Sequence, residues 1–278
     1  MNILVTNDDG IDSPGIWALA EAMSRVGDTL VVAPNKEQSG VGTSVTLHSG
    51  MSIEEVANSI EGVRAYAIGG TPSDCVILGL RRLAEAHIGL VVSGINLGAN
   101  VGNDIPYSGT VMATLQGYFR KIPSIAISLA IQERGEEPHF DVVARVAECL
   151  ALNIKNGKMP TDAILNTNVP NIPLEEIKGV VTTRTARSGY VRVAEIKGGD
   201  SVSYSTSIRK PAPADLPHQV INVPAVDEGT DIWAINSGFV SITPLRMEVT
   251  HHEVIPSLSE CISGLESELM GRVVDEGE

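Results

Sequence analysis

The 278-residue sequence has little cysteine, few aromatic residues, a deficit of basic charge and no long hydrophobic run. Its three cysteines, Cys75, Cys149 and Cys261, are widely spaced and never form a C-x-x-C pair. This spacing argues against a disulfide framework or a zinc site and predicts reduced, buried thiols in a cytosolic protein. No apolar stretch approaches the roughly 18–20 residues that span a bilayer. We therefore expect no membrane partner.

Acidic residues outnumber basic ones, with 34 Asp and Glu against 20 Lys and Arg, which gives a formal charge of −14. Nucleic acids and anionic membranes carry charge of the same sign, so the balance argues against a nucleic acid polymer as a partner. It leaves room for a small local anion site. Because Asn2, Asp8 and Asp9 fall within the first ten residues, we expect no secretory signal peptide and a cytoplasmic protein.

The first part of the chain alternates short apolar runs with segments of helical periodicity. The predicted strands are residues 3–5, 29–33, 89–93, 124–129 and 163–166. The predicted helices are residues 14–25, a segment starting at 71–72, 110–119 and 140–154. Apolar strands separated by helices are typical of a parallel sheet covered on both faces, the doubly wound α/β fold. Ligand sites in this fold lie at the carboxyl ends of the strands.

Residues from about 169 to 244 follow a different pattern, in which β-branched runs are broken by Gly and Pro. We predict an antiparallel β extension there, with strands at 180–183, 202–205, 220–223 and 240–243, followed by a helix over 257–270. The predicted domains are therefore an α/β catalytic domain, residues 1–168, and a second domain, residues 169–278, made of the β extension and the terminal helix.

Two adjacent carboxylates occur in Asn7-Asp8-Asp9-Gly10, directly after the first predicted strand. Adjacent carboxylates repel each other, so a pair at a crevice indicates a bound cation or a protonated acid. Oxygen donors without a neighbouring Cys or His favour Mg²⁺, Mn²⁺ or Ca²⁺ over zinc. The alternative is an Asx turn with a solvated acid pair.

A loop rich in Gly and Asn follows the predicted strand at 89–93 and runs to residue 110. Glycine lets backbone N–H groups approach a phosphate, and the helix that starts at Ser108-Gly109-Thr110 would add its N-terminal N–H groups. A plain surface loop is the alternative. A weaker signal is Ser39-Gly40, after the second predicted strand, where a hydroxyl could reach a metal or a phosphate.

Several well-known catalytic motifs do not occur: the Walker A lysine motif, G-x-G-x-x-G, H-E-x-x-H and G-x-S-x-G. An aspartyl-phosphate phosphatase needs a nucleophilic Asp at the strand end and a second Asp two residues later. Here Asn7 precedes Asp9 by two residues and Gly10 follows Asp8 by two, which disfavours that family.

Five separated motifs, taken in order, resemble the SurE survival-protein family. They are Asn7-Asp8-Asp9-Gly10 with Ser13-Pro14-Gly15, Ala33-Pro34 with Ser39-Gly40, residues 70–75, residues 93–110 and residues 231–244. The resemblance implies a Rossmann-like domain with a C-terminal β extension that is exchanged between subunits, giving a homodimer or a tetramer. It covers essentially the whole chain, with no motif matched between about 135 and 210.

The resemblance also implies the site residues. Metal ligands fall on Asp8, Asp9, Ser39 and Asn96, and phosphate-binding residues fall on Asn100, Ser108, Gly109 and Thr110. Asp8, Asp9 and Asn96 would be catalytic, with one divalent ion per subunit, Mg²⁺ or Mn²⁺. Of the two acids, Asp8 is favoured as the group that orients or deprotonates the attacking water. A covalent route through Ser108 or Thr110 has no histidine base nearby in the sequence.

The implied activity is a divalent-metal-dependent 5′-nucleotidase, a phosphatase that hydrolyses nucleoside 5′- and 3′-monophosphates. One alternative is a metal phosphatase that acts on other phosphoesters or on polyphosphate. A second is a nucleotide sensor that binds in the same pocket without catalysis. The sequence does not distinguish base preference or 5′ from 3′ preference.

Overall fold

A computed structural model of the chain describes residues 1–131, 136–189, 191–198, 201–208 and 227–269. The strand predicted at 220–223 lies outside these residues. The chain divides into two compact units, Met1–Leu245 and a second that starts at Arg246.

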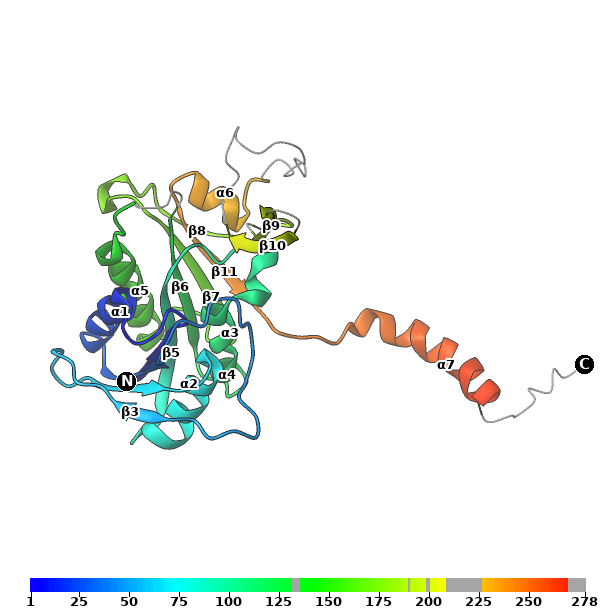
Figure 1. Cartoon of the computed structure of the whole chain (residues 1–278), viewed down its shortest axis with the longest axis horizontal. Coiled ribbons are helices and arrows are strands. Elements are labelled where there is room, and N and C mark those ends of the chain that lie inside the picture. The colour runs from blue at the N-terminus through cyan, green and yellow to red at the C-terminus, as the bar shows by residue number, and fades with distance from the viewer. Residues whose placement is uncertain (132–135, 190, 199–200, 209–226, 270–278) are drawn as a thin grey trace, which may run out of the picture. The chain divides into compact units, whose positions relative to one another are not determined.

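In the described part of the first unit, nine strands form one mixed sheet in the order β3-β4-β2-β1-β5-β6-β7-β11-β8 (Figure 1). Their bounds are β1 Asn2–Thr6, β2 Asp28–Pro34, β3 Ile53–Glu55, β4 Arg64–Ile68, β5 Ile88–Leu97, β6 Ser124–Ala130, β7 Ile164–Pro170, β8 Val180–Thr182 and β11 Val240–Leu245. The six strands from β4 to β7 in this order run parallel. This confirms the α/β fold class.

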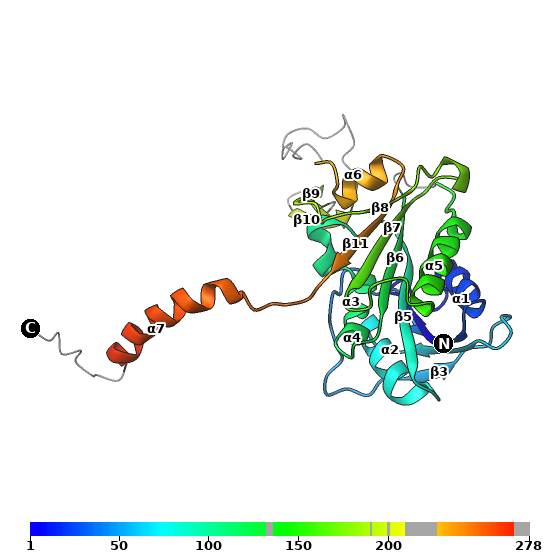
Figure 2. The same cartoon turned by 180° about the vertical axis from the view of Figure 1, so that it is seen from behind.

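The central strands are mostly apolar and are buried on both faces, as is typical of parallel strands covered by helices on both sides. In β1, Ile3 and Val5 enter one core and Leu4 enters the other. Helices α1 (Pro14–Ser24) and α5 (Phe140–Lys155) cover the first face, and α2 (Pro72–Leu78), α3 (Gly109–Ala113) and α4 (Leu115–Tyr118) cover the second (Figures 1 and 2). Pro14 at the first position of α1 and the capping box of Thr71 with Asp74 in α2 define two of the helix starts.

Strand β1 pairs with β2 on one side and with β5 on the other, with Val5 opposite both Val31 and Val92. The chain therefore leaves β1 in one direction through α1 and returns later to its other edge. This is a topological switch point, the place at the carboxyl ends of the strands where folds of this type bind ligands. The two segments with the strongest sequence signals, the turn at 7–10 and the loop at 98–108, both follow strands that end there.

The part after residue 169 differs from the prediction in two ways. Strand β11 joins β7 antiparallel and β8 pairs parallel to β11, so both strands extend the main sheet. Among the described residues after 169, only β9 (Val191–Gly198) and β10 (Ser201–Ile208) form a separate antiparallel pair. A helix, α6 (Asp231–Asn236), also forms where only strands are predicted.

The helix predicted over 110–119 is divided at Thr114 into α3 and α4. The Thr114 hydroxyl donates a hydrogen bond of 2.5 Å to the Val111 carbonyl, and its backbone N–H donates to the same oxygen at 3.2 Å. A side chain that bonds back to the preceding turn competes with the regular helical pattern and bends it.

The second unit contains helix α7 (Ile255–Leu269), close to the predicted helix at 257–270. In the described part of the chain, no helix is both long enough and apolar enough to cross a membrane. None of the three cysteines forms a disulfide. Cys75 is buried as predicted, whereas Cys149 and Cys261 are exposed, so the prediction of burial is wrong for these two.

Candidate functional site

The acidic turn after β1 is fixed by its own first residue. Asn7 is fully buried, its amide donates to the Gly10 carbonyl at 2.9 Å, and its Oδ1 accepts from the Gly10 N–H at 3.2 Å. Gly10 has a φ of +96°, a conformation that side chains of L residues rarely adopt. The Asn and the Gly of this motif therefore build the turn, and the side chains of Asp8 and Asp9 take no part in these two hydrogen bonds.

Asp8 lies against the start of α3. Its carboxylate accepts hydrogen bonds from the hydroxyl and the backbone N–H of Thr110. Burial raises the pKa of Asp8, and the two bonds from Thr110 offset part of this effect. Asp8 and Thr110, 102 residues apart in sequence, thus lie in one site.

Asp9 is partly buried beside Asp8. Burial and the neighbouring charge of Asp8 raise the pKa of Asp9 to about 7, although the N–H of Leu97 donates to its carboxylate. Its second oxygen, Oδ2, is buried and has no hydrogen-bond partner in the structure. A buried acceptor without a partner is costly unless a ligand or a cation completes it.

The loop after β2 closes over the acidic turn. The Gln38 N–H donates to the Asp8 carbonyl at 2.7 Å, and the Gly42 N–H donates to the Tyr107 carbonyl at 3.0 Å. The exposed Ser39 hydroxyl donates to Glu37 Oε1 at 2.8 Å, which leaves its oxygen able to bind a cation. The charge of Glu37 also contributes to the raised pKa of Asp8 and Asp9.

The two predicted asparagines lie at the end of β5 and in the loop after it. The strand predicted at 89–93 continues to Leu97, so Asn96 belongs to β5 and only Asn100 belongs to the loop. Asn96 is partly exposed and donates to the Gly98 carbonyl at 2.7 Å, so its Oδ1 is available as a ligand. Asn100 is buried, and its side chain donates to Ser128 Oγ at 2.8 Å. Ser108 caps α3, because its Oγ accepts from the Val111 N–H at 3.0 Å.

The donor set at the turn is compatible with a hard divalent cation. It combines two carboxylates, one with an unpartnered buried oxygen, and two neutral oxygens from Ser39 and Asn96. Across the described ranges, no three His, Cys, Asp or Glu side chains group closely enough to hold a metal ion. A cation at this turn would therefore need the neutral oxygen donors or water in addition to the carboxylates.

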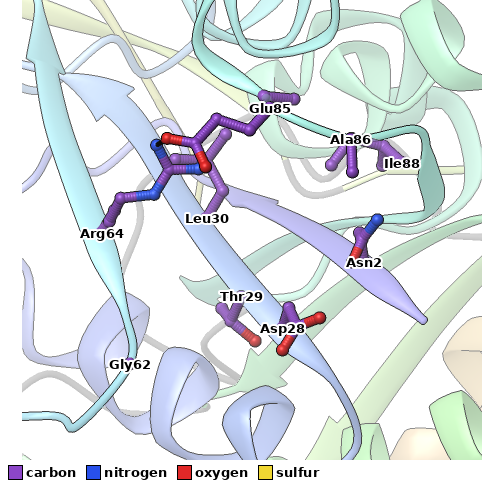
Figure 3. A pocket seen from close by; sticks show the side chains of 10 residues that line it. Asn2, Asp28, Thr29, Leu30, Gly62, Arg64, Glu85, Ala86 and Ile88 are labelled. Carbon is purple, nitrogen blue, oxygen red and sulfur yellow. Dashed lines mark hydrogen bonds and ion pairs between the residues drawn. The ribbon is translucent and has the colours of Figure 1, made fainter.

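A separate cavity of about 260 Å³ lies at the amino-terminal ends of the strands, opposite to the acidic turn (Figure 3). Its lining includes Asn2, Asp28 and Ile88, which start β1, β2 and β5. Arg64 in its wall is already paired with Glu85 at 2.7 Å. The cavity therefore shares no residue with the acidic turn and contributes nothing to that site.

Gly109 packs so closely against Asp8 that there is no room for a side chain at this position. A Cβ at this position would lie 2.7 Å from Asp8 Cβ and 2.9 Å from its Oδ2. We expect Gly109→Ala to displace the Asp8 carboxylate and to lower activity about 100-fold or more, measured as phosphate release under saturating metal. The matched control is Gly50→Ala, where a Cβ meets nothing within 4 Å. Full activity of Gly109→Ala would contradict this account of the packing.

Sequence reasoning missed the residues that surround the predicted ones. Backbone N–H groups of Gln38 and Leu97 contact the acid pair, and such groups leave no sequence signal. The polar run Asn166-Thr167-Asn168 does leave one, because it interrupts an apolar strand and is fully buried. Two of these side chains, Asn166 and Asn168, contact the loop after β5.

Comparison with known proteins places the whole arrangement in one family. The family model described as "Survival protein SurE" matches residues 3–192. The 5′-nucleotidase SurE of Dehalococcoides mccartyi (strain CBDB1) is 42% identical over 247 residues, 88% of this chain and 89% of the relative. The 5′-nucleotidase SurE of Legionella pneumophila (strain Lens) is 37% identical over 268 residues, 95% of this chain and 98% of the relative.

The crystal structure of the SurE protein from Aquifex aeolicus superposes with a TM-score of 0.78 at 36% identity, covering 94% of this chain and 99% of that one. The residues that the family model matches include the acidic turn and the Asn-rich loop. Profile, sequence and structure agree over most of the chain's length, and the chain belongs to the SurE survival-protein family.

Proposed function

We propose that this chain is a 5′-nucleotidase that hydrolyses nucleoside 5′-monophosphates, and also 3′-monophosphates, to a nucleoside and phosphate. The names of its relatives support a phosphatase that acts on nucleotides. The observation that carries the proposal is the contact of Asp8, the buried member of the acid pair, with the Gly109-Thr110 segment at the switch point. Acid pairs for a cation and N–H donors for an anion, side by side, fit the binding of a phosphoryl group.

Asp8, Asp9, Ser39 and Asn96 would hold one divalent ion, with Mg²⁺ or Mn²⁺ best suited to the oxygen donors. Such an ion, when bound, neutralises phosphoryl oxygens and makes water more acidic. The unpartnered Oδ2 of Asp9 and the free oxygens of Ser39 and Asn96 support this assignment. Asp8, Asp9 and Asn96 are then the proposed catalytic residues.

Asn100, Ser108, Gly109 and Thr110 would hold the phosphate. Gly109 has no side chain to block the approach of an anion, and an Asn amide carries two hydrogens, so Asn100 can bind Ser128 and a phosphate oxygen together. Water attacks phosphorus in line with the ester oxygen, and the P–O bond to the nucleoside breaks. The proton that the water loses goes to a carboxylate of the pair and is then passed to the departing nucleoside oxygen, so that the nucleoside alcohol and phosphate leave and the carboxylate is restored. Asp8 as the group that orients this water stays a prediction.

A substrate panel tests the activity directly. We expect phosphate release from AMP and GMP in Mn²⁺ or Mg²⁺ and a loss of about 1,000-fold in excess EDTA, because the paired carboxylates alone repel the substrate. Colorimetric phosphate measurement at matched protein concentration gives the rates. Restoring the cation after dialysis controls for irreversible unfolding by the chelator.

The same panel separates the alternatives. Faster turnover of sugar phosphates or tripolyphosphate than of nucleotides would replace the proposal by a more general metal phosphatase. Binding of AMP with metal but without phosphate release would indicate a sensor. Full activity in excess EDTA would rule out the metal role of Asp8 and Asp9.

The assembly state and the cellular location also stay predictions. We propose that the predicted second domain, residues 169–278, part of which joins the main sheet through β8 and β11, mediates a homodimer or tetramer, and that the protein acts in the cytoplasm. Light scattering coupled to size exclusion of the full chain, compared with a chain that ends after residue 245, would test the first point.

A further inference from the structure

The backbone of Asn100 is held by side chains from a neighbouring strand. Its N–H donates to Asn168 Oδ1 at 2.8 Å, and its carbonyl accepts from Asn168 Nδ2 at 3.0 Å. Asn166 Nδ2 donates to the same carbonyl at 2.9 Å. The Asn168 amide thus pairs with both backbone groups of one residue, as a strand partner would.

The Asn100 side chain is fixed as well, by its 2.8 Å hydrogen bond to Ser128 Oγ on β6. All four residues of this clamp, Asn100, Ser128, Asn166 and Asn168, are buried. The two asparagines lie two positions apart on β7, so they share one face of the sheet, and Thr167 between them faces the other. The loop after β5 is therefore attached to β6 and β7 through Asn100, in addition to the bond from Asn96 of its own strand to Gly98.

Filling this part of the core with amide side chains is less favourable in free energy than filling it with apolar ones. The Oδ1 of Asn166 is buried without any hydrogen-bond partner, and an apolar side chain of similar size would avoid that loss. The presence of Asn166 here is explained by its Nδ2, which donates to the Asn100 carbonyl. Buried polar groups that are retained at such a cost often fix a single geometry.

We propose that Asn168 is a positioning residue for catalysis, assisted by Asn166 and Ser128, and that it sets Asn100 in place to receive the phosphate. This rests on the proposed function. A preorganised donor needs no reorientation when the anion binds, and its rotamer must be fixed by groups behind it. Ser128 supplies that support to the side chain, and Asn168 supplies it to the backbone.

The test compares Asn168→Leu with Thr167→Val, a matched variant on the opposite face of the same strand. Thr167 Oγ1 is buried and has no partner, so its loss should leave the site unchanged. We expect Asn168→Leu to weaken binding of inorganic phosphate about tenfold and to raise the KM for AMP by a similar factor. The affinity of this variant for Mg²⁺ should change less than about twofold, because the proposed ligands of the ion are Asn96 and the acid pair, and Asn168 contacts none of them. Calorimetry measures both affinities well below the unfolding temperature of each variant.

Phosphate binding and KM within twofold of wild type in Asn168→Leu would overturn the proposal. Equal losses of phosphate and Mg²⁺ affinity would also overturn it, because they indicate a general loosening of the site. If Asn168→Leu does not fold, Ser128→Ala replaces it in the test. We expect Ser128→Ala to bind phosphate about threefold more weakly than Thr167→Val does. Equal phosphate binding by these two variants would overturn the proposal. A wild-type chain that does not hydrolyse AMP would instead overturn the proposed function.

Discussion

Replacing Asp8 or Asp9 by Asn is expected to lower phosphate release from AMP by about 1,000-fold or more while the fold is retained. Asn keeps the shape of the side chain and one acceptor oxygen, but it removes the negative charge that a divalent cation needs. In Asp8→Asn the bonds from Thr110 can persist through the remaining oxygen. The loss should therefore be in catalysis and metal affinity, measured by turnover across a Mn²⁺ titration.

Asp12→Asn is a suitable control for this pair. Asp12 is an exposed acid just beyond the same turn, so its substitution changes the net charge by the same amount without touching the site. Its turnover should stay within about twofold of wild type, since isolated surface charges have small effects. Normal turnover by either Asp8→Asn or Asp9→Asn would contradict the metal role, and circular dichroism would identify a variant that has merely unfolded.

The position of the site could be predicted because apolar strands are visible in sequence. The runs that become β1 and β5 end just before Asp8 and near Asn96, and the carboxyl ends of neighbouring parallel strands meet. The hydrophobic pattern and the turn residues therefore both predict a site at the carboxyl ends of these strands. That each acid would be buried, and that the pKa of Asp9 would reach about 7, depends on atoms from other segments.

The strand β7 marks the limit of the pattern. The apolar run predicts a strand that ends at residue 166, whereas the strand continues to Pro170 through Asn166, Thr167 and Asn168. Polar residues normally argue against a buried central strand. Two of them are accommodated here because Asn100, 66 and 68 positions away in sequence, pairs with their amides. A single sequence does not reveal a partner at that distance.

Short helices were missed for a different reason. Helix α6 has six residues, too few for helical periodicity to appear, although Thr230 as its N-cap and Asp231 in its first turn are ordinary start signals. Asp231 also accepts from the N–H groups of Gly102 and Ala186, at 2.8 and 2.9 Å. The helix is stabilised by these tertiary bonds, so local propensity alone could not have predicted it.

In the absence of metal, Asp9→Asn is expected to be more stable than wild type at pH 8, by about 1–3 kcal/mol. The pKa of Asp9 is about 7 in the folded chain against an ordinary value of 3.8. Between these values the folded state keeps a proton that the unfolded state has lost, so the free energy of unfolding falls as pH rises from about 4 to about 7. Above pH 7 the full penalty of the buried charge is present.

Denaturant unfolding in EDTA at pH 4.5, 6, 7 and 8 measures this difference. The two proteins should converge at the lowest pH, where Asp9 is protonated in the folded state, and separate as pH rises. Adding Mn²⁺ at pH 8 should reverse their order, because a cation that binds only the folded state stabilises wild type and has weak affinity for the variant. If Asp9→Asn is less stable than wild type in EDTA at every pH, the charge of Asp9 does not destabilise the folded state. The unpartnered oxygen of Asp9 would then need an explanation other than a bound cation.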